Sequence, residues 1–323
     1  MILISRAKFV VAMVTFGCGL LTASPVLSQA YPARPIMLVV PFAAGGGNDI
    51  VARVIAERIG RTLGQQVVVE NRPGAAGSIG TLQVAKSAPD GYVLGLGSNA
   101  TLAIAPAYYP NAGYNPLTSF SPVGLIATSA LVLMVNRSAP AHSVQELIAY
   151  AKREPGRLTY GSGGNGSPAH LTGALFAQRA AIKLTHVPYR GTGPAIADLV
   201  GGHLTMIFSP LPPTVGHIKD GTLRALAVSG AGRSLVFPEI PTIAEAALSA
   251  FESTQQYGII APSGTPATIV AKLNAALRDA LALDDVKVRI AADGAEPAPG
   301  SPEDYRIDIE REQMKWSTFV KQL

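Results

Sequence analysis

The sequence predicts an α/β protein built on parallel β-sheets. Short apolar segments rich in β-branched residues alternate along the chain with longer segments that have helical periodicity. The chain has 323 residues, enough for roughly two domains at ~150 residues each. Ligands of such sheets bind outside the carboxyl ends of the strands, so the loops that follow the strands are the first candidates for a site.

The first strand–loop–helix unit covers residues 36–60. An apolar strand at 36–40 ends at Pro41, and the loop 43–47 contains only alanine and glycine. Asn48 and Asp49 then supply capping chemistry for a helix. Glycines let a ligand approach the backbone, and the first N–H groups of a helix have no internal partner. The unit is therefore either an anion site or only a tight connection, and this stretch alone leaves both open.

Two further units repeat the pattern. A strand at 66–70 leads into the glycine loop 71–80 and a helix at 79–86, and a strand at 92–96 leads into Ser98 and Asn99. A strand at 158–160 precedes the loop 161–167 and a helix at 169–180. We expect the remaining strands at 123–126, 130–135, 184–187, 204–208, 223–228 and 256–260, and the remaining helices at 144–152, 193–200, 267–281, 284–292 and 303–320.

Residues 1–30 have the features of a secretory signal peptide. Arg6 and Lys8 precede an apolar segment, and small residues stand before a cleavage site near Ala30. The apolar run is shorter than the ~20 residues that a membrane span needs. The formal charge of +5 falls to +3 without Arg6 and Lys8, which is too small and too dispersed for a nucleic-acid partner. We therefore expect an exported, periplasmic protein whose one cysteine, Cys18, is removed with the signal.

Several motifs follow one another in the order and spacing of one family: YPARPIMLVVPFAAGGGND, VVVENRPGAAGSIG, APDGYVLGLGS, LTYGSGGNGSPAHL, HVPYRG and GTLRALAVSG. From residue 31 to residue 323 the chain resembles the tripartite tricarboxylate transporter substrate-binding proteins, the Bug receptors. The resemblance implies a two-lobed, type II periplasmic binding protein (Venus flytrap) fold with a mainly parallel sheet in each lobe. Lobe 1 would comprise residues 31–130 and 256–323, and lobe 2 residues 131–255.

The resemblance also implies what the protein does. A monomeric receptor would capture a small organic anion, usually a carboxylate, between the lobes and deliver it to a membrane permease, without a cofactor, a metal or nucleic acid. The ligand-binding residues that it implies are Phe42, Ala43, Gly45, Gly46, Asp49, Arg72, Gly74, Ser98, Asn99, Ser162, Gly163, Ser167, His170, Tyr189 and Ser209. The chain departs from the family pattern in two places, with alanine for proline at 43 or 44 and with Ser209-Pro210 where a polar pair is usual.

Several of these residues have a purely structural interpretation as well. Asp49 in a first helical turn complements the helix dipole without any ligand. Arg72 lies close to Glu70 in the sequence and could serve only an ion pair, His170 only a cap, and Tyr189 only lobe packing. The sequence leaves these alternatives open.

An enzyme is the competing class of function. Residues 161–166 match G-x-G-x-x-G, but the acidic residue expected about 20 positions later is missing. The segment around Ser78 approaches G-x-S-x-G with alanine in the first position, which keeps an exported hydrolase with a serine nucleophile as the alternative. No H-E-x-x-H or similar metal spacing occurs. We therefore expect a receptor and not an enzyme.

The three glycine loops share one further property. The segments 43–47, 73–80 and 161–167 contain no lysine or arginine, and each precedes a helix. We expect a carboxylate to be held there by backbone amides and hydroxyl groups, and not by a cluster of basic side chains.

Overall fold

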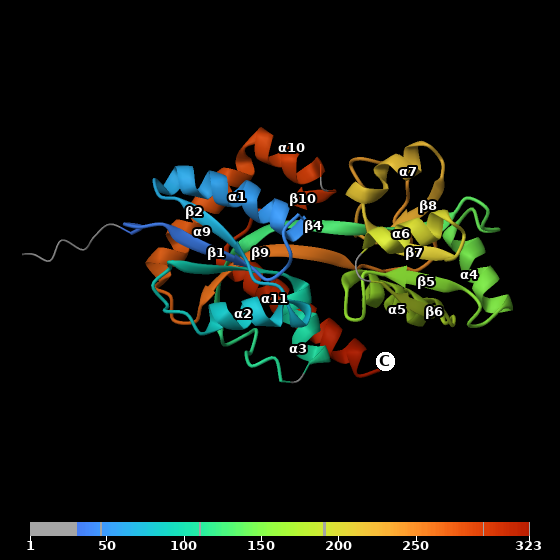
Figure 1. Cartoon of the computed structure of the whole chain (residues 1–323), viewed down its shortest axis with the longest axis horizontal. Coiled ribbons are helices and arrows are strands. Elements are labelled where there is room, and N and C mark those ends of the chain that lie inside the picture. Colours follow the sequence, from blue (N-terminus) through green and yellow to red (C-terminus); the bar gives the residue numbers. More distant parts are fainter. Residues whose placement is uncertain (1–30, 46, 110, 190–191, 293, 323) are drawn as a thin grey trace, which may run out of the picture. The chain divides into compact units, whose positions relative to one another are not determined.

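The computed structural model describes residues 31–322 except 46, 110, 190, 191 and 293. The predicted signal peptide lies outside the described residues. Among the residues that are described, no helix is both long and apolar enough to cross a membrane. The strands form two sheets that share one long strand, β4 (Phe120–Asn136) (Figure 1).

The first sheet has three parallel strands at its edge. β1 (Ile36–Val40) lies between β2 (Val67–Asn71) and β3 (Val93–Gly97), and all three run in the same direction. β9 (Thr254–Pro262) continues the sheet antiparallel to β3, and it pairs in turn with β4. The short strand β10 (Ala295–Pro297) also pairs with β4.

The second sheet repeats this arrangement. β5 (Thr159–Ser162) lies between β6 (Thr185–Pro188) and β7 (Met206–Pro210), again in parallel. The last part of β4 pairs antiparallel with β7 and with β8 (Leu223–Val228).

β4 is where the structure departs most from the sequence prediction. Two strands were expected at 123–126 and 130–135, but the chain forms one strand across both. Thr128 and Ser129 interrupt the apolar pattern, yet they continue the ladder opposite Gln256 and Gln255. β4 pairs with β9 as far as Ala130 and with β7 and β8 beyond it. β4 leaves the first sheet and β9 returns to it, so the two strands are antiparallel, and each sheet is mixed around its parallel core.

The helices connect and cover these strands. The helices of the described residues are α1 (Gly47–Leu63), α2 (Ser78–Ala85), α3 (Ala105–Tyr108), α4 (Val144–Arg153), α5 (Pro168–Ala180), α6 (Thr192–Val200), α7 (Val215–Lys219), α8 (Ile243–Ala246), α9 (Ala267–Ala282), α10 (Asp284–Ala292) and α11 (Pro302–Val320), with short helical turns at Ala75–Gly77, Ala100–Ile104 and Pro212–Thr214. The expected helices are present, with ends that differ by one or two residues, as helix ends commonly do.

Both sheets are covered by helices on both faces. In β1, Leu38 packs in a core with α1 and α9, whereas Val39 packs on the opposite face with α2 and α11. In β4, Leu133 packs with α4 and α5, and Val132 packs with α6. Strands buried on both faces read as continuous apolar runs, which is why the sequence identified them.

Candidate functional site

The glycine loops follow the carboxyl ends of the parallel strands. In the first sheet these ends are Val40, Asn71 and Gly97, and in the second they include Ser162 and Pro188. Because parallel strands end at the same edge of a sheet, the predicted residues fall into two groups, one on each sheet.

Asp49 organises the first loop. Its carboxylate is buried and accepts hydrogen bonds from the Gly45 amide at 2.9 Å, from Arg53 Nε at 3.0 Å and from Asn71 Nδ2 at 2.9 Å. Asn71 Nδ2 also donates to the Phe42 carbonyl at 3.0 Å. The carboxylate therefore joins the loop, the helix after it and the end of β2.

These hydrogen bonds favour the ionised form of Asp49. Burial alone would raise the pKa of the carboxyl group, but the hydrogen bonds from Arg53, Gly45 and Asn71 outweigh it and hold the pKa below its ordinary value. The sequence analysis missed Arg53 and Asn71 as parts of this site. Arg53 is four residues after Asp49 on the same helix, and that spacing could have indicated the pair.

The second loop packs closely against the first. Gly77 has φ 90°, and a Cβ there would lie 2.6 Å from Thr101 Cγ2 and 3.3 Å from Phe42 Cζ. Gly74 has φ 132°, and a Cβ would meet Ile79 Cδ1 at 2.6 Å. Only glycine fits such positions without displacing its neighbours.

Two polar atoms at the helix starts beside these loops have no hydrogen-bond partner among the described residues. They are Asn48 Oδ1, in the first turn of α1, and Ser78 Oγ, at the first residue of α2. A buried polar atom without a partner is uncommon, and a bound molecule is one explanation for it. Ser78 is the nucleophile of the hydrolase alternative, and no hydrogen bond joins it to a histidine or a carboxylate among the described residues.

Ser98 and Asn99 lie inside the protein at the end of β3. Ser98 is fully buried, and its amide donates to Thr101 Oγ1 at 3.1 Å. Asn99 Nδ2 donates to the Thr254 carbonyl at 2.6 Å, and Asn99 Oδ1 accepts from the Gln256 amide at 3.3 Å. The side chain of Asn99 is thus bonded to β9.

The third loop is held by a buried hydroxyl group. Ser162 Oγ is fully buried and lies 2.7 Å from His186 Nε2. It also accepts from the Gly164 amide at 3.1 Å, and the Ser162 carbonyl accepts from the Tyr189 amide at 3.0 Å. His186 was not among the predicted site residues, although it lies in the HVPYRG motif and directly opposite Tyr160 in the β5–β6 ladder.

His170 holds the next turn of the same loop. Its Nδ1 accepts from the Gly166 amide at 3.1 Å, while its own amide donates to Ser167 Oγ at 3.3 Å, which caps α5. The rings of His170 and His186 stack with centroids 4.1 Å apart. Burial lowers the pKa of both histidines, and for His186 burial together with the charge of His170 lowers the pKa to about 4.

The remaining predicted residues are placed as follows. Tyr189 donates its hydroxyl hydrogen to Asp198 Oδ2 at 2.6 Å, and burial together with that carboxylate raises the pKa of Tyr189 to about 12. Ser209 is fully buried in β7 opposite Val132. Ala43 and Gly45 are exposed on the first loop, Gly163 is partly exposed on the third, and Gly46 lies outside the described residues.

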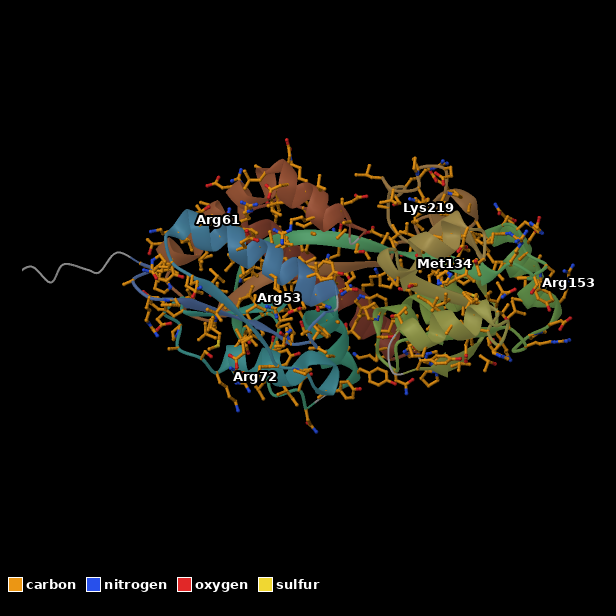
Figure 2. The ribbon with its side chains drawn as sticks, turned by 45° about the horizontal axis from the view of Figure 1, so that its top comes forward. Arg53, Arg61, Arg72, Met134, Arg153 and Lys219 are labelled. Carbon is orange, nitrogen blue, oxygen red and sulfur yellow. The ribbon has the colours of Figure 1, made fainter. Side chains whose placement is uncertain are left out.

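Arg72 lies on the surface with its side chain 53% exposed and forms an ion pair with Glu70. Figure 2 shows Arg72, Arg61, Arg153 and Lys219 on different elements and not gathered at one place. Within the described residues, no group of three or more histidine, cysteine, aspartate or glutamate side chains could hold a metal ion.

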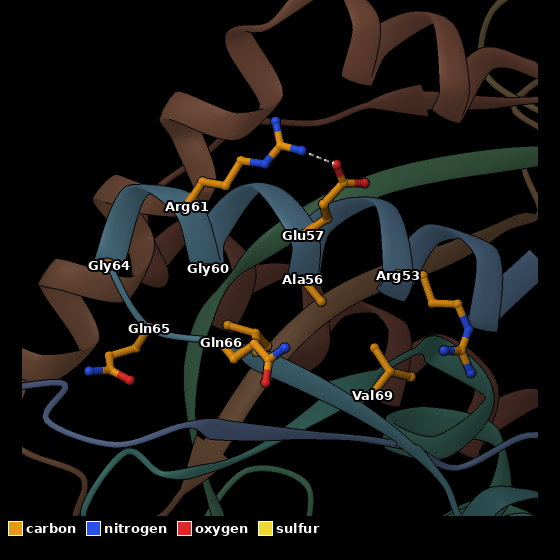
Figure 3. A pocket seen from close by; sticks show the side chains of 10 residues that line it. Arg53, Ala56, Glu57, Gly60, Arg61, Gly64, Gln65, Gln66 and Val69 are labelled. Atoms are coloured by element: carbon orange, nitrogen blue, oxygen red, sulfur yellow. Dashed lines mark hydrogen bonds and ion pairs between the residues drawn. The ribbon is translucent and has the colours of Figure 1, made fainter.

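A surface pocket of about 670 Å³ lies between α1 and β2 (Figure 3). Its lining includes Arg53, Glu57 and Arg61 and none of the predicted site residues. Arg61 bonds to Glu57 at 2.8 Å, and Glu57 also pairs with Arg289 at 2.9 Å. Because these charges already pair within the protein, we do not take the pocket as the anion site.

Comparison with known proteins decides the family. Residues 51–323 match the sequence model of the tripartite tricarboxylate transporter family receptor. The chain belongs to this family. It is 40% identical to protein BugT of Bordetella pertussis over 301 residues, which cover 93% of this chain and 92% of BugT.

Two solved structures of the same kind are also similar. The R. palustris protein Rpa4515 with adipate is 38% identical, with a TM-score of 0.80 over 90% of this chain and 97% of that one. MatC from Rhodopseudomonas palustris with bound malate is 33% identical, with a TM-score of 0.78 over 90% of this chain and all 100% of MatC. The receptor therefore has the two-lobed type II periplasmic binding protein fold.

Proposed function

We propose that this receptor captures a small organic acid in the periplasm, by a carboxylate group, and delivers it to a membrane permease of the tripartite tricarboxylate type. The family and the receptor fold support this function. Adipate and malate, the molecules bound to two similar proteins, are both small dicarboxylates. The same resemblance favours a receptor over an enzyme.

We propose that lobe 1 comprises residues 31–130 and 256–323, and that lobe 2 comprises residues 131–255. The change of partners along β4 supports these boundaries, because β4 pairs with β9 up to Ala130 and with β7 from Leu131 onward. β9 begins at Thr254, beside the proposed return to lobe 1. Two strands that pass between lobes are suitable hinges for closure around a ligand.

One observation carries the proposal: both parallel cores end in glycine loops, and side chains of the adjoining strand and helices form hydrogen bonds with the loop amides. Asp49 bonds the Gly45 amide, Ser162 bonds the Gly164 amide and His170 bonds the Gly166 amide. Loops fixed before binding lose little entropy when they meet a ligand, which favours affinity. Three amides are thereby already used, so we expect other amides and hydroxyl groups of these loops to contact the acid.

A thermal-shift panel tests the proposal. The panel contains malate, adipate, succinate and citrate, with adipamide as the uncharged control for adipate. A molecule that binds only the folded protein raises its melting temperature, so at least one acid should do so while the matching amide does not. If every acid leaves the melting temperature unchanged at millimolar concentration, the proposed class of ligand is wrong.

Small-angle scattering tests the two-lobed capture separately. An acid held by both lobes stabilises a closed form because it binds that form better than the open one. The radius of gyration should therefore decrease when the best acid of the panel is added, and adipamide should leave it unchanged. The hydrolase alternative is tested with a panel of generic esters, and ester hydrolysis that Ser78→Ala abolishes would favour it over the receptor.

A further inference from the structure

Side chains from both proposed lobes form hydrogen bonds with the start of β9 and with Ser253, the residue before it. From lobe 1, Asn99 bonds the Thr254 carbonyl at 2.6 Å and the Gln256 amide at 3.3 Å. From lobe 2, Thr172 of α5 lies 2.6 Å from Ser253, hydroxyl oxygen to hydroxyl oxygen. Asn99, Thr172 and Ser253 are all buried. Within residues 253–256, Ser253 is thus bonded to lobe 2, and Thr254 and Gln256 are bonded to lobe 1, where the chain passes between the lobes.

A buried carboxylate extends the contact to the last helix. Glu312 of α11 is 5% exposed, and its Oε2 accepts from Trp316 Nε1 at 2.8 Å and from Asn99 Nδ2 at 3.3 Å. Lys315 Nζ lies 3.6 Å from Glu312 Oε1 and donates to the Glu252 carbonyl at 2.9 Å. One oxygen of Glu312 therefore accepts from both Asn99 and Trp316 and holds these two side chains together.

Trp316 makes an apolar contact with the second lobe. It packs in an apolar cluster with Ala103, Ile104 and Phe319 of lobe 1 and with Leu171 of lobe 2, all of them buried. Leu171 directly follows His170, which holds the third glycine loop, and Ala103 is four residues after Asn99. The cluster thus joins the segment after β3 to the helix that follows the third loop.

We propose that Asn99, Thr172, Ser253, Glu312 and Trp316 form a pivot network that sets how the two lobes move when the acid binds. Its members are positioning residues, and Glu312 acts through Asn99 without touching the acid. The proposal rests on the two-lobed capture proposed above. It also gives Asn99 a role other than the ligand contact expected from the sequence, since both ends of its amide are already bonded inside the protein.

The hydrogen bonds at residues 253–256 restrict where the two lobes can rotate. Two lobes joined by β4 and β9 alone could rotate about several points along these strands. The hydrogen bonds from lobe 1 to Thr254 and from lobe 2 to Ser253 hold these two neighbouring residues in place, so that rotation between the lobes is confined to this point. Loosening the bonds of one lobe should then loosen the other, because coupling between sites travels through packed, hydrogen-bonded contacts.

Hydrogen exchange of the ligand-free protein tests this coupling. Glu312→Gln keeps the shape of the side chain but removes its charge, which weakens the bonds from Asn99 Nδ2 and Trp316 Nε1 at one oxygen, and it places an NH2 group either against these two donors or against Lys315 Nζ at the other. We expect faster exchange not only at residues 99–104 and 253–256 but also at residues 171–176 of α5, in the other lobe. Glu310→Gln is the matched control, because Glu310 lies on the same helix in an exposed pair with Arg306.

Thr172→Val tests the same network from the second lobe, and it decides the matter if Glu312→Gln does not fold. It removes the hydroxyl group that meets Ser253 with little change in shape, and it should speed exchange at residues 99–104 of lobe 1. If in either folded variant the faster exchange stays within the lobe that carries the substitution, the pivot network does not exist.

A second measurement uses the best acid of the panel. The chain has one tryptophan, so the emission of Trp316 reports on this cluster. Glu312→Gln should change the emission shift produced by the acid and weaken binding at least about fivefold, a typical lower value for coupled sites. Wild-type affinity together with a wild-type emission shift in Glu312→Gln would overturn the proposal. If the wild-type protein binds no acid, the proposed function fails, and hydrogen exchange alone decides on the pivot.

Discussion

The carboxylate of Asp49 accepts a hydrogen bond from the backbone amide of Gly45 at 2.9 Å, across the start of α1. The same carboxylate bonds to Arg53 and to Asn71, so one buried side chain ties the first glycine loop to its helix and to the end of β2. The backbone at Gly45 is thus held by side chains of the protein itself.

Asp49→Asn should therefore destabilise the protein. An asparagine amide group would face the donors of Asn71 or Arg53, and at least one donor to this buried side chain would lose its acceptor. We expect a loss of about 1–3 kcal/mol in the free energy of unfolding, measured by urea denaturation.

Asp285→Asn is the control for Asp49→Asn. Asp285 has a half-exposed side chain and pairs with Arg58 at the surface, where such a pair contributes about 0–1 kcal/mol. Equal losses in the two variants would show that the hydrogen bonds of Asp49 at the first loop stabilise the protein no more than a surface ion pair does.

Ser162→Ala should cost more than the single ligand hydrogen bond that its sequence context suggests. The hydroxyl group is fully buried and bonds to both His186 and Gly164, so its removal takes this partner from the His186 ring on β6 and from the Gly164 amide of the loop. We expect a loss of about 1–3 kcal/mol of stability together with weaker binding of the best acid, measured by denaturation and by calorimetry. Ser138→Ala, at an exposed hydroxyl that bonds to Asn136, is the control. A stability equal to that of wild type would mean that the hydroxyl group does not hold the loop.

The His170–His186 stack should make the protein less stable in mild acid. The pKa of His186 in the folded protein is about 4, against an ordinary value near 6.5, because burial and the neighbouring His170 disfavour the charged form. Between these two pH values the unfolded chain binds more protons than the folded one, so stability falls as the pH decreases from about 6.5 to about 4.

The size of this effect is at most about 3 kcal/mol for His186, and it is measured as the difference in free energy of unfolding between pH 7 and pH 4.5. His186→Gln should reduce that difference, whereas His142→Gln, at an exposed histidine, should leave it as in wild type. Asp49 contributes at a lower pH, because its folded pKa is below its ordinary value and its contribution is lost only below about 4. A pH dependence that is identical in His186→Gln and wild type would exclude the stack as its source.

The local elements of this fold were predictable because their signals are local. β1 is an apolar run that ends at a proline, and Ser143 with Glu146 correctly marked the start of α4. The continuity of β4 was not predictable, because Thr128 and Ser129 have no apolar signal and are held by pairing with residues more than 100 positions away.

The site was predictable to the level of the loops but not to that of the atoms. Residue types and spacing located Asp49 and Ser162, yet nothing in the local sequence shows that the carboxylate is bonded by Asn71 or the hydroxyl group by His186. Asn99 shows the same limit, since its partners lie on β9 and α11. Such long-range contacts depend on the packing of whole elements.

The last prediction separates recognition by the loops from recognition by an arginine. Arg72→Gln should leave the dissociation constant of the best acid within about threefold of wild type, because the guanidinium group is exposed and paired with Glu70. Gly45→Val should weaken binding by at least about tenfold. Gly45 has φ 83°, which a β-branched residue adopts only with strain, and its amide donates to the Asp49 carboxylate.

Gly156→Val controls for backbone strain, since Gly156 has φ 79° and open space around its Cβ position, on the turn that precedes β5. It should lower stability but bind the acid as wild type does. Neutral donors can supply the binding energy without an arginine. A micromolar complex requires about 8 kcal/mol, and charge-assisted hydrogen bonds contribute about 1.5–3 kcal/mol each, so a few neutral donors suffice. If folded Gly45→Val binds like wild type while Arg72→Gln loses most of its affinity, an arginine clamp replaces recognition by the loops.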